Sequence, residues 1–388
     1  MHWNGAFASM LFLNNWEYTR NVSFAKQYTW PLVSGLVSWW SCFLQRSTSA
    51  NGSLLLNDWN AIDPDESGEN QEVHNPMTGL AFAKRLADFK ITLSEALFPG
   101  QPAPPDALEI VQHLAPFPLA PDTPADKPVW SSWRNHSSGC CTPLYPIFPT
   151  ELLSQASDEA ALETARRSVK QYTGPTTTAL ASRRPVEAFP AAVRAGHSVS
   201  SGWQPREVLE GLEKMLVLLK CCDSQMLPVA NGGGVENVGA TRAVNEMLLV
   251  APDGLFIEIF PFFPADEPAS FTTLRSKGGW LVSASQSASG LVSDVRIEAT
   301  VTEMCRFVDP WATNNGSDSG EPMVTCAPSP TAPPVTRTSV GRRHGLLTWR
   351  MNAGQRCNVT GSWKTDDVGL RDVGRQQNHG RHIRYAQV

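Results

Sequence analysis

The stretch ANGGGVENVGATRAVNEMLLV, residues 230–250, is the segment around which we interpret the rest of the chain. Its glycines, Gly232–Gly234, allow backbone conformations that a Cβ would forbid. Glu236 and Asn237 follow directly, and apolar residues then recur at helical spacing. A carboxylate beside an amide at a glycine-rich helix entrance can position a water or a hydroxyl group. The structural alternative is that Glu236 favours the positive end of the helix dipole and Asn237 caps the helix.

The bulk composition narrows the class of protein. The chain has 388 residues and a formal net charge of −5, so its charge balance does not favour a nucleic-acid partner. Its 13 tryptophans suit stacking on sugar rings, although tryptophan is also a common core residue. No apolar run approaches the ~20 residues that a membrane-spanning helix needs. We therefore expect a globular protein without a membrane span.

The hydrophobic pattern changes along the chain. Helical spacing predicts helices over residues 3–20, 24–44, 76–97, 102–114, 158–169, 185–195, 204–219 and 240–249. After Leu255 the pattern becomes that of strands, predicted near residues 256–260, 280–284, 292–297 and 300–307. Residues 322–334 are rich in proline and predicted to be loose. We expect a helical part over 1–252, a β domain over 253–370 and a polar basic tail over 371–388.

Two further segments carry candidate functional side chains. Residues 51–75 form a polar segment with six acidic residues, among them Asp65 and Glu66, and are predicted to be a loop. Arg134 and His136 precede the run LYPIFP at residues 144–149. A neutral imidazole both donates and accepts hydrogen bonds, so His136 can bind a hydroxyl group or a carboxylate. A solvated acidic loop and a structural histidine are the alternatives.

These segments, taken in order, resemble a known enzyme family. NNWEYT at 14–19, LYPIFP at 144–149, EMLL at 246–249 and LRSKGGW at 274–280 are similar to segments of glycoside hydrolase family 95, the inverting α-L-fucosidases. The resemblance covers roughly residues 4–310 and is strongest at 136–149 and 231–283. It implies an (α/α)6 toroid followed by a β-sandwich. The family's N-terminal β domain and first barrel helices would precede residue 1, so we expect a partial toroid.

The resemblance also implies roles for individual residues. Asp63-Pro64-Asp65-Glu66 stands where the family has Ser-Pro-Glu, so Glu66 or Asp65 is the expected general acid. Glu236 is the expected base or water-holding residue, with Asn237 as its amide partner, although it lies one position after the family's Asp. The expected substrate-binding residues are Asn14, Asn15, Trp16, Arg134 and His136. In an inverting enzyme the two carboxyls stand roughly 6.5–9.5 Å apart across one cavity.

Other functions remain open at this point. The altered acid motif and the presence of only one of the family's two histidines favour a catalytically inactive carbohydrate-binding relative. A truncated, non-functional fragment is a further alternative. No G-x-S-x-G elbow, phosphate loop or zinc-ligand spacing occurs, so we predict no cofactor and no metal.

The sequence features that bear on the cellular compartment disagree. No signal peptide is visible, yet five N-x-S/T sequons suit a protein of the secretory pathway or lysosome. They lie at Asn21, Asn51, Asn135, Asn315 and Asn358. Cys305, Cys326 and Cys357 are expected to supply one disulfide, with its pairing open.

Overall fold

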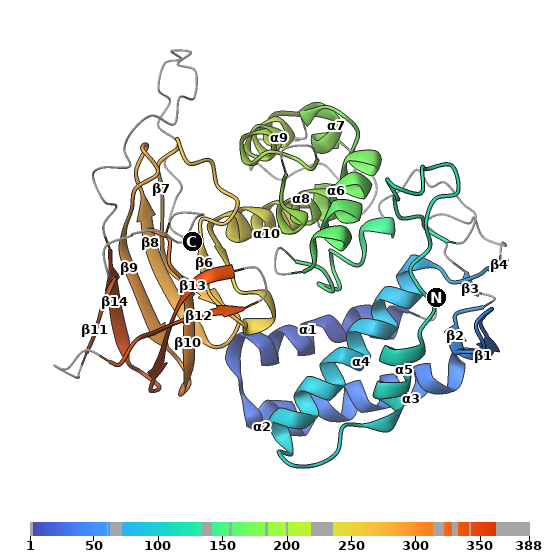
Figure 1. Ribbon diagram of the computed structural model, residues 1–388. Coiled ribbons are helices and arrows are strands. Elements are labelled where there is room, and N and C mark those ends of the chain that lie inside the picture. Colours follow the sequence, from blue (N-terminus) through green and yellow to red (C-terminus); the bar gives the residue numbers. More distant parts are fainter. Residues whose placement is uncertain are drawn as a thin grey trace.

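Helices form the N-terminal part of the molecule and sheets the C-terminal part (Figure 1). The computed structural model describes residues 3–59, 61–62, 72–133, 142–154, 157–182, 185–198, 201–218, 236–312, 322–327, 333–340 and 343–361. The predicted order of helices and then sheets is confirmed. A closed helical ring is not shown.

Each of the eight predicted helices has a counterpart in the structure. The helices are α1 (Asn4–Thr19), α2 (Val22–Phe24), a π-helix (Ala25–Thr29), α3 (Trp30–Phe43), α4 (Met77–Leu97), α5 (Pro105–His113), α6 (Glu159–Thr173), α7 (Thr177–Ser182), α8 (Pro185–Ala195), α9 (Pro205–Leu218) and α10 (Glu236–Leu248). The short helix α7 was not predicted. The single helix predicted over 24–44 is wrong in detail, because a π-helical turn lies between α2 and α3.

Pro31 provides the physical reason for that π-helical turn. Proline has no N–H to donate and its ring clashes with the carbonyl four residues earlier in a regular helix. The turn at Ala25–Thr29 immediately precedes it, and the Trp30 N–H bonds back to the Ala25 carbonyl. An i to i+5 turn of this kind is a common way for a helix to absorb such a conflict.

The helices form two groups, each with its own hydrophobic core. In Figure 1, α1 to α5 lie below and α6 to α10 lie above. The lower core contains Leu13, Val37 and Phe82, and the upper core contains Phe189 and Trp203. Phe117 and Leu152 pack against both cores. The two groups are therefore joined by apolar contacts as well as by the charged residues described below.

The C-terminal part is a β-sandwich of two antiparallel sheets. One has the order β11-β14-β9-β8-β7 and the other β10-β13-β12. The strands are β7 (Ala269–Ser276), β8 (Trp280–Gln286), β9 (Val292–Ala299), β10 (Glu303–Val308), β11 (Met323–Ala327), β12 (Thr336–Val340), β13 (Arg343–Met351) and β14 (Arg356–Thr360). Alternate residues point inward, and those of both sheets share one core.

Several local predictions need correction. Residues 323–327, inside the segment predicted to be loose, form β11, which pairs with β14. The segment 51–75 is not all loop, because β2 (Leu54–Asn57) pairs with β1 (Gln45–Thr48). Two further short strands, β3 (Ala61–Ile62) and β4 (Glu72–Val73), pair on either side of residues 63–71. Near residues 256–260 only β6 (Glu258–Ile259) is a strand, and it pairs with β5 (Leu249–Val250).

One disulfide among the described residues joins two neighbouring strands of the larger sheet. Cys326 of β11 and Cys357 of β14 are register partners, and they are bonded. Cys305 is buried in the same core with a free thiol. The structure thus selects one pair from the three cysteines that the sequence left open.

Across the described residues, no helix is long and apolar enough to cross a membrane.

Candidate functional site

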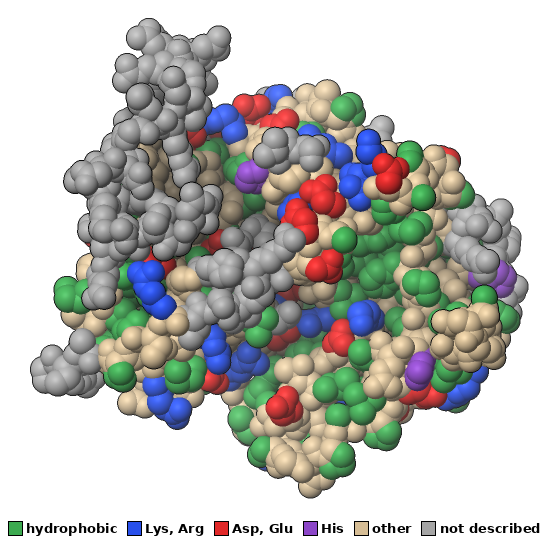
Figure 2. All heavy atoms as spheres, in the orientation of Figure 1, with side chains coloured by type: hydrophobic (Ala, Val, Ile, Leu, Met, Phe, Trp, Pro, Cys, Tyr) green, Lys and Arg blue, Asp and Glu red, His purple; other side chains and the backbone are tan. Residues whose placement is uncertain are grey.

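Seven charged side chains meet where the two helix groups and the sandwich come together. We call them the charge cluster: Glu17, Arg85, Glu151, Arg194, Arg242, Glu246 and Lys277. Figure 2 shows acidic and basic side chains gathered near the centre of this face, between the lower and upper helices. Five members are buried, which is unusual for charged residues unless they are paired.

Arg194 of α8 is the best-connected cation of the charge cluster. Its Nε donates to Glu246 Oε2 and its Nη2 to Glu246 Oε1, both at 2.7 Å. The same Nη2 lies 2.7 Å from Glu151 Oε1, and Nη1 donates to the Ile147 carbonyl at 2.8 Å. The planar guanidinium fork matches a carboxylate in this bidentate manner. Helices α8 and α10 are thereby bonded through their buried faces.

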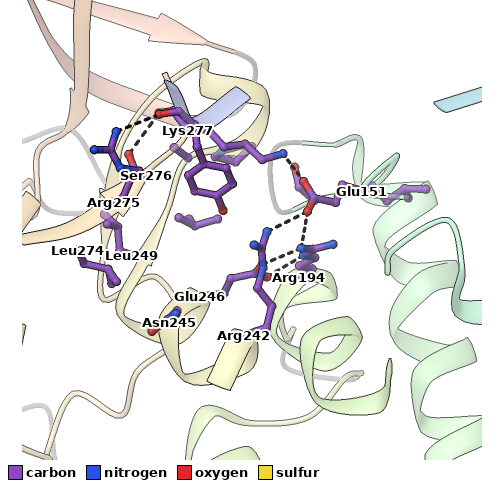
Figure 3. A pocket seen from close by; sticks show the side chains of 16 residues that line it. Glu151, Arg194, Arg242, Asn245, Glu246, Leu249, Leu274, Arg275, Ser276 and Lys277 are labelled. Atoms are coloured by element: carbon purple, nitrogen blue, oxygen red, sulfur yellow. Dashed lines mark hydrogen bonds and ion pairs between the residues drawn. The ribbon is translucent and has the colours of Figure 1, made fainter. Parts of the chain in front are cut away.

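Glu151 is the common acceptor of the charge cluster. Figure 3 shows Arg194, Arg242 and Lys277 converging on its carboxylate. Arg242 Nη2 donates to Glu151 Oε1 at 2.9 Å, and Lys277 forms an ion pair with Oε2. The backbone of Glu151 has a φ of 58°, the left-handed region that costs a residue with a Cβ about 1 kcal/mol or more. Three cations hold the residue in this conformation.

Lys277, in the turn between β7 and β8 of the sandwich, forms an ion pair with Glu17 of α1. Its Nζ lies 2.8 Å from Glu17 Oε2, and Arg85 of α4 pairs with the same Glu17 carboxylate. The Gly278 N–H donates to the Glu17 carbonyl at 2.7 Å. Gly278 has a φ of 89°, and a Cβ there would stand 2.6 Å from Trp280 Nε1. Glycine is therefore required for the β7–β8 turn to reach the helices.

The three carboxyls of the charge cluster are ionised. Burial raises the pKa of Glu151, but the positive charges of Arg194, Lys277 and Arg242 outweigh it and hold the pKa well below its ordinary value. Burial likewise raises the pKa of Glu17, and Arg85 and Lys277 bring it below the ordinary value.

The pKa of Glu246 is lowered by its arginine partners, which outweigh the effect of burial. A general acid for glycoside hydrolysis needs a raised pKa. These carboxyls therefore have the opposite property and are suited to anchoring.

A pocket of about 270 Å³ opens beside the charge cluster. The polar residues along its wall are Tyr18, Glu151, Ser154, Arg194, Arg242, Asn245, Glu246, Arg275, Ser276 and Lys277. Leu249, Leu274 and neighbouring backbone close the apolar side (Figure 3). The described lining thus contains four positive and two negative side chains.

The predicted residues on α1 lie next to Glu17. Trp16 is buried in the lower core, with the Arg20 guanidinium carbon 5.3 Å from its ring centroid. The Asn15 carbonyl accepts a hydrogen bond from Thr19 Oγ1 at 2.6 Å. Asn14 and Asn15 are half-buried. The structure places Trp16 in a core environment, and the asparagines near it.

The predicted catalytic residues lie away from the charge cluster or outside the described residues. Glu236 and Asn237 begin α10, while Glu246 lies near its C-terminal end. Ten residues of helix separate Glu236 from Glu246, which is about 15 Å along the axis. The side chains of Glu236 and Asn237 are outside the description, as are Asp65, Glu66, Arg134 and His136 altogether.

None of the members of the charge cluster is among the site residues predicted from the sequence. A signal was nevertheless present, because Glu17, Glu246 and Lys277 lie inside the quoted segments NNWEYT, EMLL and LRSKGGW, and Glu151 follows LYPIFP by two residues. Glu246 in EMLL is the clearest case, because a charged residue within an otherwise apolar segment indicates a paired buried charge. Which partner it meets depends on contacts between distant parts of the chain.

Comparison with known proteins adds no assignment. No protein-family profile and no curated protein matches this chain. Among the described residues, no group of three or more His, Cys, Asp or Glu side chains has the arrangement of a metal site.

Proposed function

We propose that the chain is a glycoside hydrolase of the inverting α-L-fucosidase type, which removes terminal sugars from glycans. One observation carries the proposal. The four segments that resemble the family are far apart in sequence, and the charge cluster draws on each of them or on a residue close behind. Glu17, Glu246 and Lys277 lie within three of the segments, and Glu151 lies just after the fourth. Shared packing of this kind supports the view that the resemblance reflects one coherent fold.

The fold that we propose is a partial (α/α)6 toroid followed by the β-sandwich. The two groups of helices, α1 to α5 and α6 to α10, would each contribute a segment of the ring. The charge cluster would then fix the sandwich against the helices through Lys277.

In the proposed enzyme, the carboxyls of the charge cluster have a structural role and other carboxyls are catalytic. Its carboxyls have lowered pKa values and are held by arginine and lysine, so none of them suits the role of general acid. We assign the acid to Glu66, with Asp65 as the neighbouring candidate. We assign Glu236 as the base that activates water, with Asn237 orienting that water. The anchored C-terminal end of α10 would hold Glu236 at a fixed distance from the charge cluster.

The test is release of sugar from an aryl α-L-fucoside and from fucosylated and galactosylated oligosaccharides. Glu236→Gln should lower kcat at least ~10²-fold, since a general base contributes typically 10²–10⁴-fold. The matched control is Glu303→Gln, an exposed glutamate at the start of β10. Proton NMR of the first product should show inverted anomeric configuration. Retained activity in Glu236→Gln, or a retained anomeric configuration, would contradict the proposal.

The identity of the general acid is tested with substrates that differ in their leaving groups. Glu66→Gln should slow substrates with poor leaving groups far more than aryl glycosides, because an activated leaving group needs little protonation. If Asp65→Asn shows this pattern and Glu66→Gln does not, the acid is Asp65. Binding of fucosylated glycans by the unaltered chain without release would identify a carbohydrate-binding relative in place of an enzyme.

We propose a secretory or lysosomal-type compartment. The Cys326–Cys357 disulfide supports it, because disulfides persist in oxidising environments. The sequon residues Asn21, Asn51 and Asn358 are exposed and accessible to a glycan. Chain secreted from a eukaryotic host should lose mass on treatment with an N-glycosidase. Absence of any mass change, with all sequons intact, would count against this compartment.

A further inference from the structure

We infer that the pocket beside the charge cluster binds a small ligand carrying an anionic group: a carboxylate, sulfate or phosphate. The inference concerns a second site and does not depend on the proposed glycosidase activity. It starts from the charges of the side chains that line the pocket. Four of them are positive, Arg194, Arg242, Arg275 and Lys277, and two are negative, Glu151 and Glu246. Two positive charges are thus in excess along the wall of this pocket. An anion entering that space would be attracted and would offset the excess.

Arg275 is the cation best placed to make a new contact. It lies on β7, lines the pocket and is exposed, and its Nη1 donates to the Tyr18 carbonyl at 3.3 Å. No carboxylate pairs with it among the residues that the structure describes. The other lining cations are already bonded to glutamates, so Arg275 has the most remaining capacity for a ligand.

Two neutral side chains complete a set of hydrogen-bonding groups. The Tyr18 hydroxyl and the Asn245 amide both line the pocket. Within the described part of the chain, neither side chain makes a hydrogen bond. Burial and neighbouring Glu151 raise the pKa of Tyr18 even though Arg242 acts the other way, so its hydroxyl keeps the proton that it would donate. A guanidinium, a phenol and an amide together supply the donors that an oxyanion accepts.

The size and lining of the pocket restrict the ligand. About 270 Å³ is below the usual range of ≈ 300–1,000 Å³ for drug-sized ligands, so the site fits an inorganic anion or a single small organic acid. Leu249 and Leu274 form an apolar wall that a sugar acid can contact with its ring. Glu151 and Glu246 are each held by at least two cations, which reduces their repulsion of an anion.

The experiment is isothermal titration calorimetry of the full chain at constant ionic strength. The probes are sodium sulfate, sodium phosphate, sodium glucuronate and neutral glucose. We expect saturable binding with a stoichiometry of one for at least one of the anions, and no heat of binding for glucose. Tighter binding of glucuronate than of sulfate would identify a sugar acid as the source of the anionic group. The reverse order would identify a free inorganic anion.

Variants then test the assignment to this pocket. Arg275→Gln should weaken binding about tenfold or more, since a hydrogen bond to a charged group is lost. Arg275→Lys should recover part of the affinity. Arg296→Gln, on an exposed position of β9, is the matched control and should bind as tightly as the unaltered chain.

Tyr18→Phe provides a second variant that removes one donor without changing charge. We expect it to weaken binding to a smaller extent than Arg275→Gln. Equal weakening by Arg275→Gln and Arg296→Gln would show non-specific attraction and would overturn the inference. Absence of saturable binding for all three anions would overturn it as well.

Discussion

Two regions of the molecule, the interior of the sandwich and the contact between the sandwich and the helices, are stabilised by different interactions. In the sandwich, inward-facing apolar residues alternate along the strands and a disulfide joins β11 to β14. Between the helices and the sandwich, the charge cluster places ionised side chains in a buried space. Apolar packing tolerates many arrangements of similar volume, whereas a buried ion pair requires each partner at one position. The helical part should therefore be the more sensitive to pH, and the sandwich the more sensitive to reduction.

Acidification should give the largest effect and should act on the helical part first. The folded pKa values of Glu17, Glu151 and Glu246 lie below their ordinary value of 4.5, so their contribution to stability is fully present above that pH. It is lost as the pH falls through the folded pKa values, because protonation removes the partners of buried cations. Hydrogen exchange measured between pH 7 and pH 3 should show α1 and α10 losing protection before β8 and β9. Simultaneous loss in both halves would contradict the contrast.

Removal of one carboxylate should give the largest effect of any single substitution. Glu151→Gln leaves Arg194, Arg242 and Lys277 without their shared acceptor, and breaking a buried pair costs about 3–5 kcal/mol. Urea unfolding at pH 7 measures this loss. The variant should also depend less on pH than the unaltered chain. A loss below ~1 kcal/mol would show that solvent already reaches the charge cluster.

Removal of the disulfide should give an intermediate effect confined to the sandwich. The bond closes a sequence separation of 31 residues, and a native disulfide of this kind contributes typically about 2–4 kcal/mol. Cys326→Ala combined with Cys357→Ala should reduce protection in β11 and β14 and leave α10 unchanged. Hydrogen exchange at pH 7 distinguishes the two regions. Equal loss in α10 would mean that the halves unfold as one unit.

A surface ion pair should give the smallest effect and calibrates the others. Arg356 Nε donates to Glu298 Oε2 at 2.7 Å on the outer face of the larger sheet, and the Arg356 side chain is 67% exposed. Glu298→Gln should cost at most about 1 kcal/mol, since solvent screens the pair. It is the matched control for Glu151→Gln because both replace a paired glutamate. A comparable cost in both variants would remove the distinction between buried and exposed pairs.

The helices were predictable from sequence because their determinants are local. Spacing of apolar residues predicted α8 over 185–195, which is where the structure has it. The prediction over 24–44 failed at Pro31, whose effect on the preceding turn depends on backbone geometry that periodicity does not represent. Residues 323–327 were predicted to be loose because prolines surround them, yet alternate burial and the pairing with β14 make them a strand. Pairing with a distant strand outweighed local composition.

The charge cluster was beyond prediction from one sequence. Glu17 and Lys277 are 260 positions apart, and nothing local indicates that their side chains meet. Glu246 was visible within EMLL, but its bidentate contact with Arg194 requires α8 and α10 to pack side by side. The catalytic roles expected for Glu66 and Glu236 and the substrate-binding role expected for His136 stay predictions, since their side chains lie outside the described residues.

The contact of Lys277 with Glu17 has a consequence for biosynthesis. Glu17 leaves the ribosome 260 residues ahead of its lysine, an interval of about 13–50 s at ≈ 5–20 residues per second. Throughout that interval the Glu17 carboxylate lacks one of its final counter-charges, the Lys277 ammonium. We expect chaperones to engage the growing polypeptide until the β7–β8 turn emerges, and protease resistance of stalled nascent chains to rise once that turn is exposed.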